Sequence, residues 1–201
     1  MGDSRVAIID SGGANIASLV YALQRLGADA TLTTDAGAIR RAPRVILPGV
    51  GAARDAMQRL RNCGLVDVIR GLTQPVLGIC LGLQLLADAS EEDDVECLGV
   101  IPGTATRLPA DPRHPIPNMG WCPIVRRSDH ALLDGLGDGS YFYFVHSYAL
   151  PVSDVTVASA EHAAAFSAVV SERNFVAAQF HPERSAAAGS QLLRNFLGAD
   201  A

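Results

Sequence analysis

Two glycines flank a cysteine in the segment Gly78-Ile79-Cys80-Leu81-Gly82, which lies between a predicted strand and a predicted helix. This is the spacing of a nucleophile elbow, a tight turn whose neighbouring residues must be small. Such a turn lifts the sulfur clear of the sheet, and the free N–H groups at the start of the next helix favour a thiolate. An ordinary strand-to-helix turn with a buried cysteine would fit the same five residues, so the elbow needs support from elsewhere in the chain.

A thiol nucleophile needs a base, and the base needs a group that orients it. Among the five histidines, His181 has Glu183 two residues after it, at the end of a strand-like run. Residues i and i+2 of an extended chain share a face, so this carboxylate can hold the imidazole in one tautomer. The pair alone also fits an exposed strand end. Together with the cysteine elbow it predicts a Cys80–His181–Glu183 triad.

Acyl transfer also needs hydrogen-bond donors for the oxygen of a tetrahedral intermediate. The backbone N–H of Leu81 is one candidate, because it begins the helix after the elbow. A second is the segment Pro48-Gly49-Val50-Gly51, which ends a predicted strand and whose glycines let the backbone approach a ligand closely. The same residues would serve an ordinary strand-ending turn. We expect the Gly49–Val50 peptide to rotate at little cost and to act as a two-state element.

The composition excludes several classes of function. The 201 residues have a formal net charge of −5, and 49% are hydrophobic and 18% charged, as in one globular domain spanning 1–201. A mildly acidic chain without a cluster of Lys and Arg predicts no nucleic-acid partner. No apolar run approaches the about 20 residues of a membrane helix. Residues 1–5 lack the basic start of a signal peptide, so we expect a cytoplasmic protein without a membrane partner.

The four cysteines give no sign of a metal centre. Cys63, Cys80, Cys97 and Cys122 form no CxxC pair, which disfavours zinc binding and thioredoxin-type chemistry. Without an export signal we expect no disulfides. Apart from Cys80, we expect the cysteines to be buried apolar side chains. The sequence therefore predicts no metal and no cofactor.

The elements that must position these groups alternate in the first half of the chain. β-rich runs are followed by stretches with helical spacing of their apolar residues, which predicts a mostly parallel α/β sheet flanked by helices. The second half predicts a β-rich extension of the same domain, with a proline-rich loop at 109–117. The predicted strands are 5–10, 29–33, 44–47, 75–79, 95–107, 123–127, 141–145, 155–159, 167–170 and 174–180, and the predicted helices are 15–26, 52–61, 65–72, 81–87 and 185–197.

Several segments together resemble the class I, triad-type glutamine amidotransferases. They are PGVG at 48–51, GICLGLQLL at 78–86, YFVHSY at 143–148 and QFHPERS at 179–185. Within that class, IDSGGANIAS at 9–18, PNMGW at 117–121 and YFYFVHSY at 141–148 are most similar to the glutaminase subunits of imidazole glycerol phosphate synthase, from histidine biosynthesis. The resemblance runs from residue 6 to residue 196 and implies the class I glutamine amidotransferase fold.

The resemblance implies a reaction and a role for each matching residue. Cys80 would be the nucleophile, His181 the general base and acid, and Glu183 the carboxylate that orients it. Glutamine would be hydrolysed to glutamate and ammonia through a Cys thioester. The implied oxyanion and substrate-binding residues are Gly49, Val50, Gly51, Leu81, Gln84, His146, Ser147 and Tyr148.

The resemblance also implies a partner, a (β/α)8-barrel cyclase subunit. In the heterodimer the cyclase would take the ammonia and make imidazole glycerol phosphate and AICAR. We expect the interface at Asn15, Asn118, Met119 and Trp121, because an exposed aromatic side chain is a usual hot spot. Core packing of this single tryptophan is the alternative.

Two departures and three alternatives remain. The family usually has His at the position of Asn118 and Asn at the position of Cys122, so the coupling between subunits is in question. The chain could instead serve another acceptor synthase, or be a stand-alone γ-glutamyl hydrolase. A non-catalytic regulatory subunit is disfavoured by the intact Cys80, His181 and Glu183.

Overall fold

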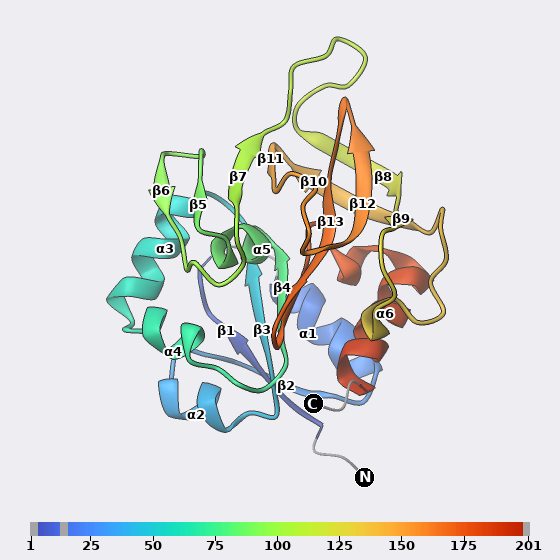
Figure 1. Cartoon of the computed structure of the whole chain (residues 1–201). Helices are drawn as coiled ribbons and strands as arrows, with labels where there is room; N and C mark the ends of the chain where they lie inside the picture. The colour runs from blue at the N-terminus through green and yellow to red at the C-terminus, as the bar shows by residue number, and fades with distance from the viewer. Residues whose placement is uncertain (1–3, 13–15, 199–201) are drawn as a thin grey trace.

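One twisted, eight-stranded sheet forms the centre of the computed structural model, which describes residues 4–12 and 16–198 (Figure 1). Its strand order is β2 (Asp29–Thr33), β1 (Arg5–Ile9), β3 (Arg44–Gly49), β4 (Val76–Cys80), β14 (Phe175–Ala178), β13 (Ala164–Glu172), β12 (Thr156–His162) and β9 (Val125–Arg126). The pairings from β2 to β14 are parallel and those from β14 to β9 antiparallel. The predicted parallel half with a β-rich extension is therefore confirmed.

Helices cover both faces of the parallel strands (Figure 1). Apolar side chains alternate along β1: Val6 and Ile8 belong to one core, and Ala7 and Ile9 to the other. This two-sided burial is why the strand is apolar at successive positions. The first core packs against α1 (Ile16–Arg25) and α6 (Ala186–Gly198), and the second against α2 (Ala36–Arg41), α3 (Ala53–Asn62), α4 (Val66–Arg70) and α5 (Leu81–Leu86).

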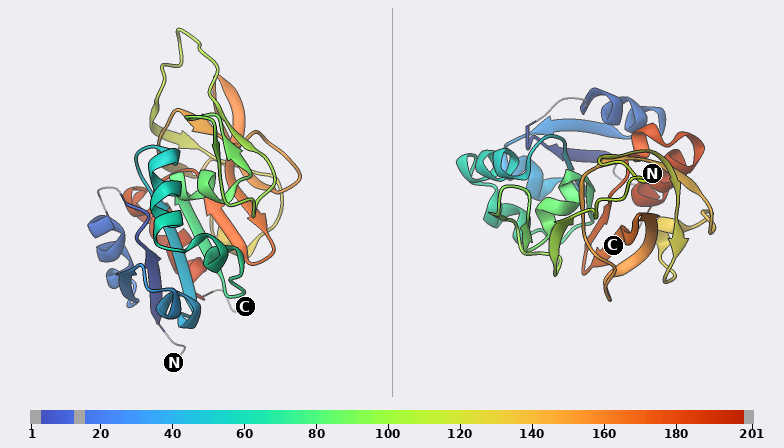
Figure 2. Two further views of the ribbon diagram at one scale, coloured as in Figure 1. Left: turned by 90° about the vertical axis from the view of Figure 1, so that its left-hand side faces the viewer. Right: turned by 90° about the horizontal axis from the view of Figure 1, so that it is seen from above.

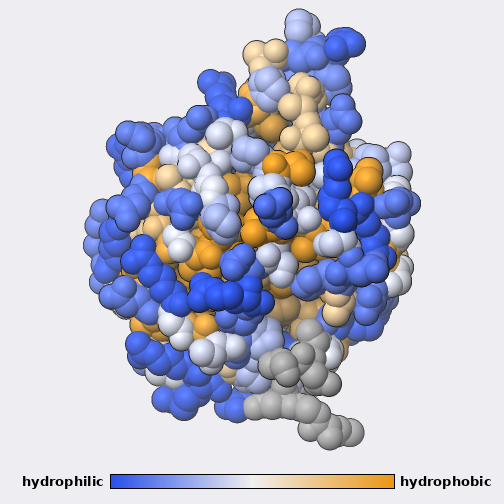
Figure 3. Space-filling model, in the orientation of Figure 1, coloured by the Kyte–Doolittle hydropathy of each residue, from blue (hydrophilic) through white to orange (hydrophobic). Residues whose placement is uncertain are grey.

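Two small sheets stand at the carboxyl end of the parallel strands. One pairs β8 (Asn118–Pro123) with β10 (Tyr141–His146), and the other has the order β11 (Tyr148–Ala149), β7 (Thr104–Arg107), β5 (Ala89–Ser90) and β6 (Val95–Glu96). The loop at 109–117 projects beyond them (Figure 2), and its tip is hydrophilic on the face shown in Figure 3. Two 3-10 turns, η1 (Ala131–Leu133) and η2 (Pro182–Arg184), complete the elements of the described residues.

The prediction of helices and strands was wrong at several places where contacts between distant segments determine the secondary structure. Strand β8 was missed, because Gly120 and Pro123 weaken its pattern and its pairing with β10 supplies the stability. Helix α2 was also missed, and the predicted strand at 95–107 is two short strands separated by a turn. The predicted strand at 174–180 ends at Ala178, so the segment that follows leaves the sheet.

None of the helices in the described parts of the chain combines the length and the apolar character that crossing a membrane requires.

Candidate active site

Cys80 occupies a strained turn between β4 and α5. Its φ is 54° and its ψ −111°, a region that is costly for a residue with a Cβ. The flanking glycines are required by close contacts: a Cβ on Gly82 would lie 1.8 Å from the Leu47 carbonyl oxygen, and one on Gly78 would lie 2.8 Å from Leu86 Cδ1. The predicted elbow geometry is therefore confirmed, because no larger residue fits on either side.

The Cys80 sulfur faces a cavity of about 260 Å³ and is itself only slightly exposed. It lies 3.7 Å from the Val145 carbonyl oxygen, to which the thiol donates, and 3.9 Å from Gln179 Nε2. His181 lines the same cavity. The elbow thus brings the sulfur from β4 into contact with groups from β10 and from the segment after β14.

His181 and Glu183 form a buried pair beside the sulfur. His181 Nδ1 lies 2.9 Å from Glu183 Oε1, and the side chains are 9% and 5% exposed. The predicted contact between these residues is therefore present, but the predicted reason is wrong. The chain is extended at His181 and then enters the 3-10 turn η2, and this turn folds the carboxylate back onto the ring.

Opposing effects act on the pKa of His181. Burial lowers it, but contacts with the Cys80 side chain and with the Glu183 carboxylate outweigh burial and raise the pKa to about 10. The ring therefore keeps its second proton at neutral pH. An imidazolium beside a thiol stabilises the thiolate and can later donate a proton to a leaving group.

A closed set of hydrogen bonds holds the backbone of His181 against β10. The His181 N–H donates to the Tyr143 carbonyl over 2.9 Å, the Tyr143 N–H donates to Ser185 Oγ over 2.9 Å, and that hydroxyl donates to the His181 carbonyl over 2.7 Å. Sequence reasoning missed Ser185 in this role. The serine is fully buried, and only the fold places it beside β10.

The segment 48–51 runs beside the elbow. Gly49 pairs with Cys80 in the parallel register of β3 and β4, and a Cβ on Gly49 would lie 2.8 Å from Leu81 Cβ. The next residues, Val50 and Gly51, line the large cavity. The segment therefore lies beside the sulfur and its cavity, and its role as a hydrogen-bond donor to a ligand stays a prediction.

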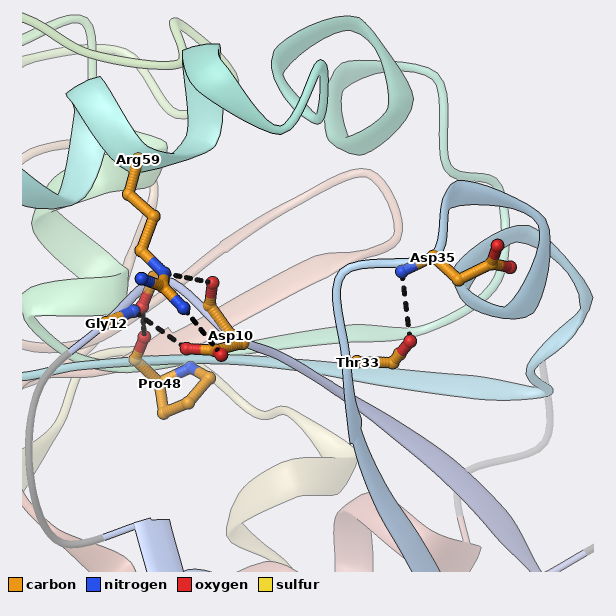
Figure 4. A network of polar contacts seen from close by, with 7 residues as sticks. Asp10, Gly12, Thr33, Asp35, Pro48 and Arg59 are labelled. Atoms are coloured by element: carbon orange, nitrogen blue, oxygen red, sulfur yellow. Dashed lines mark hydrogen bonds and ion pairs between the residues drawn. The ribbon is translucent and has the colours of Figure 1, made fainter.

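A polar cluster anchors the base of this segment (Figure 4). Ser11 Oγ donates to the Pro48 carbonyl over 2.7 Å. The preceding Asp10 is held by Arg59 of α3, with Nη2 2.7 Å from Oδ2, and its Oδ1 accepts from the Gly12 N–H. These contacts thus tie together the carboxyl ends of β1 and β3.

The cavity collects most of the predicted pocket residues. Val50, Gly51, Cys80, Leu81, Gln84, His146, Ser147, Tyr148 and His181 line it. Gly49 does not, and lines instead a smaller cavity of about 20 Å³ that His181 and Glu183 also border. Sequence reasoning missed Glu92, Pro117 and Val145, which line the large cavity as well. Glu92 Oε2 accepts from the Ala53 N–H at the start of α3 over 2.9 Å. The two residues are far apart in the sequence, so this contact could not be predicted from local spacing.

His146 is a second buried histidine at the cavity, with neutral partners. Its Nδ1 lies 3.0 Å from the Tyr148 carbonyl oxygen, and its Nε2 lies 3.1 Å from Asn118 Nδ2. Burial lowers the pKa of His146 to about 4 and outweighs the contact with the carbonyl. The ring is therefore neutral at physiological pH.

Of the residues predicted for a partner interface, two are exposed and one is buried. Met119 and Trp121 of β8 are 64% and 50% exposed, so core packing of the tryptophan is wrong. Trp121 makes an edge contact with Tyr143, whose ring also carries the Arg184 guanidinium 4.7 Å from its centroid. The prediction for Asn118 is wrong as regards its side chain, which is buried against His146. Asn15 lies outside the described residues.

Of the remaining cysteines, Cys122 was expected to be buried and is half-buried, with its thiol 3.7 Å from Asn118 Oδ1, whereas Cys63 and Cys97 have no contact with the site. Cys97 is buried, and burial raises its pKa to about 11. Cys63 was expected to be buried and is exposed, because it follows the last turn of α3 on the surface. Among residues 4–12 and 16–198, no three His, Cys, Asp or Glu side chains are grouped as a metal would require.

Comparisons with known proteins identify the family to which this chain belongs. The family described as glutamine amidotransferase class-I matches residues 7–199. The chain is 54% identical over 192 residues to imidazole glycerol phosphate synthase subunit HisH of Xanthomonas axonopodis pv. citri, covering 96% of each chain. It is 51% identical over 195 residues to subunit HisH 2 of the same enzyme from Legionella pneumophila strain Paris, covering 97% of this chain and 98% of the relative.

Solved structures share the fold at lower identity. The crystal structure of a glutamine amidotransferase superposes with a TM-score of 0.73 at 20% identity, covering 96% of each chain. A glutamine amidotransferase from Thermotoga maritima gives a TM-score of 0.69 at 17% identity, covering 98% of this chain and 97% of that one. At these identities the likeness concerns the architecture alone.

Proposed function

Because this chain belongs to the class-I glutamine amidotransferase family, we propose that it is the glutaminase subunit of an imidazole glycerol phosphate synthase. It hydrolyses glutamine to glutamate and ammonia, and a partner subunit consumes the ammonia in histidine biosynthesis. The relatives named as HisH subunits of that synthase cover almost the whole chain at about half identity. The observation that carries the proposal is the strained Cys80 elbow facing the buried His181–Glu183 pair across one cavity.

The first half of the reaction forms a thioester on Cys80. Cys80 starts as a thiolate beside the imidazolium of His181, and the thiolate attacks the side-chain amide carbon of glutamine. The backbone N–H of Leu81 and one from the Gly49–Val50 segment hold the oxygen of the tetrahedral intermediate. His181 then donates its proton to the amide nitrogen, the C–N bond breaks and ammonia leaves. Glu183 keeps the ring in the required tautomer throughout.

The second half releases glutamate. His181 is neutral after it has protonated the ammonia, so it can take a proton from water. The resulting hydroxide attacks the γ-glutamyl thioester, and the C–S bond breaks. The imidazolium and the thiolate are restored beside each other, which is the state that the raised pKa of His181 favours.

Polar groups of the cavity suit the amino-acid end of glutamine. The Glu92 carboxylate lines the cavity and can accept hydrogen bonds from an α-ammonium group. Ser147 and Tyr148 border the same space, and Gln84 forms part of the wall. A cavity of about 260 Å³ holds one small amino acid.

The partner is a (β/α)8-barrel cyclase subunit that docks over β8 and η2. Met119, Trp121, Tyr143 and Arg184 form a surface there that combines exposed aromatic rings with a cation, the usual composition of an interface hot spot. A docked partner keeps water out and prevents loss of ammonia. Rotation of the Gly49–Val50 peptide is the step by which the partner's ligand switches the glutaminase on.

The experiment assays glutaminase in the complex with such a cyclase, with and without the cyclase ligand. We expect low activity from the chain alone and much higher activity from the liganded complex. Cys80→Ser should reduce the activity of that complex by at least about 10³-fold, because the hydroxyl lacks a stable anion. Cys63→Ser, at an exposed site, is the matched control. Survival of most activity in Cys80→Ser would refute the proposal.

A further inference from the structure

Four buried polar side chains lie near the site without a part in the triad chemistry. Gln84, Asn118, His146 and Gln179 are 4%, 2%, 6% and 0% exposed. Burying such groups is costly unless each finds a hydrogen-bond partner. They form a series of two pairs, Gln84 with Gln179 and Asn118 with His146, which are joined through the Tyr148 carbonyl, and one end of the series reaches the Cys80 sulfur.

The series is anchored on one backbone carbonyl. The Tyr148 oxygen accepts from Gln84 Nε2 over 2.9 Å and lies 3.0 Å from His146 Nδ1. A carbonyl oxygen has two lone pairs and can only accept. Both neighbours must therefore present an N–H to it, and this requirement determines the direction of every later hydrogen bond.

The inner branch runs from this carbonyl to the nucleophile. Because Gln84 turns its amide nitrogen toward Tyr148, the same nitrogen is the atom 3.3 Å from Gln179, which must accept through Oε1. Gln179 Nε2 is then the atom directed at the Cys80 sulfur, 3.9 Å away. The other neighbour of the sulfur, the Val145 carbonyl, accepts from the thiol. One contact favours the thiol and the other the thiolate.

The outer branch stabilises the same arrangement from β8. With its proton on Nδ1, His146 accepts at Nε2 from Asn118 Nδ2, and Asn118 Oδ1 accepts from the Cys122 thiol over 3.7 Å. Each member can satisfy its neighbour in only one orientation. The Tyr148 carbonyl is thereby held where Gln84 reaches it.

We propose that Gln179 is a hydrogen-bond donor to the reacting sulfur of Cys80, oriented by Gln84 and the Tyr148 carbonyl, and that it favours the thiolate. This inference rests on the proposed function in that Cys80 is taken as the nucleophile. An N–H directed at a sulfur stabilises its anion and leaves the neutral thiol almost unaffected. The sulfur thus has a donor from the sheet side in addition to the imidazolium of His181.

The test measures the rate at which iodoacetamide alkylates Cys80 of the full chain as a function of pH, with the Cys80 peptide followed by mass spectrometry. Gln179→Glu has the same shape but directs a carboxylate oxygen at the sulfur. We expect the midpoint of the profile to rise by at least about one pH unit, which makes alkylation at pH 7 roughly tenfold slower. Gln24→Glu, the same change at an exposed position of α1, should leave the profile unchanged.

A second variant changes the residue that orients Gln179 and not Gln179 itself, so the inference can still be tested if Gln179→Glu does not fold. Gln84→Met removes the amide that orients Gln179 and leaves the sulfur untouched, so the midpoint should rise in the same direction and slow alkylation at pH 7 roughly threefold. An unchanged profile in either folded variant overturns the inference. Failure of the proposed function would look different, because glutaminase activity would then survive Cys80→Ser.

Discussion

Two buried histidines border the same cavity and have opposite protonation. His181 is paired with the Glu183 carboxylate and the Cys80 sulfur, and its pKa rises to about 10. His146 is paired with the Asn118 amide and a backbone carbonyl, and its pKa falls to about 4. Burial lowers the pKa of both rings. At His181 the Cys80 and Glu183 side chains outweigh burial, whereas at His146 the contact with the Tyr148 carbonyl does not, and the nearby His162 and His181 lower the pKa further.

This contrast separates two uses of one side chain. A histidine with anionic partners keeps a proton that it can give to a leaving group, as the proposed mechanism requires of His181. A buried histidine with neutral hydrogen-bond partners, such as His146, stays uncharged near pH 7 and connects β8 to the cavity wall by hydrogen bonds. Giving His181 a neutral partner should lower its pKa, and giving His146 an anionic partner should raise its pKa. Each change can be tested separately.

The largest effect is expected from Glu183→Gln, which gives His181 a neutral partner like that of His146. The pKa of His181 should fall, and kcat for glutamine in the complex should drop by about 10²–10³-fold. The rate of Cys80 alkylation at pH 7 should fall as well, because less thiolate is stabilised. Glu161→Gln, an exposed glutamate on β12, is the matched control. A variant with normal kcat would mean that the carboxylate does not control the ring.

The opposite exchange is Asn118→Asp, which gives His146 an anionic partner. A carboxylate at the position of the Asn118 amide should raise the pKa of His146 by about 1–3 units and move its proton to Nε2. The ring then loses its donor to the Tyr148 carbonyl. Measurement of the ring resonances by NMR over pH 4–8 reports both changes, with Asn62→Asp on the surface of α3 as control. A His146 that still fails to titrate above pH 5 would contradict this account.

The smallest effect concerns the pH dependence of stability. The raised pKa of His181 means that its contribution is complete below pH 6.5 and is lost as the pH rises toward about 10. The lowered pKa of His146 means that its contribution is complete above pH 6.5 and is lost as the pH falls toward about 4.

Urea unfolding at a series of pH values measures both contributions. His181→Gln should flatten the alkaline side of the profile and His146→Gln the acid side, each by about 1–3 kcal/mol relative to the parent chain. His114→Gln, with a side chain 41% exposed in the loop at 109–117, serves as comparison. Parallel profiles for all three variants would show that neither ring is linked to folding in this way.

The sequence predicted the parts of the site that depend on local spacing. The spacing of the glycines at 78 and 82 around Cys80 suggested the elbow, but the contacts that require these glycines come from β3, α5 and β14, which only the fold brings together. His181 and Glu183 are two residues apart, so their contact was foreseen even though its cause is a 3-10 turn rather than a strand. Strand β8 and the burial of Asn118 were not foreseen, because both depend on the pairing with β10.

What the sequence by itself determined is which residues were candidates for nucleophile, base and orienting carboxylate, because a cysteine between two glycines and a His–Glu pair can be recognised from their spacing along the chain. Which buried polar atoms donate and which accept was decided only by the tertiary structure. The Tyr148 carbonyl, brought beside Gln84 and His146 by the packing of distant segments, determines the direction of the hydrogen bonds toward Gln179 and toward Asn118. The oxygen and nitrogen of an amide side chain can exchange places by rotation, and the hydrogen-bond partners around it determine which orientation is stable.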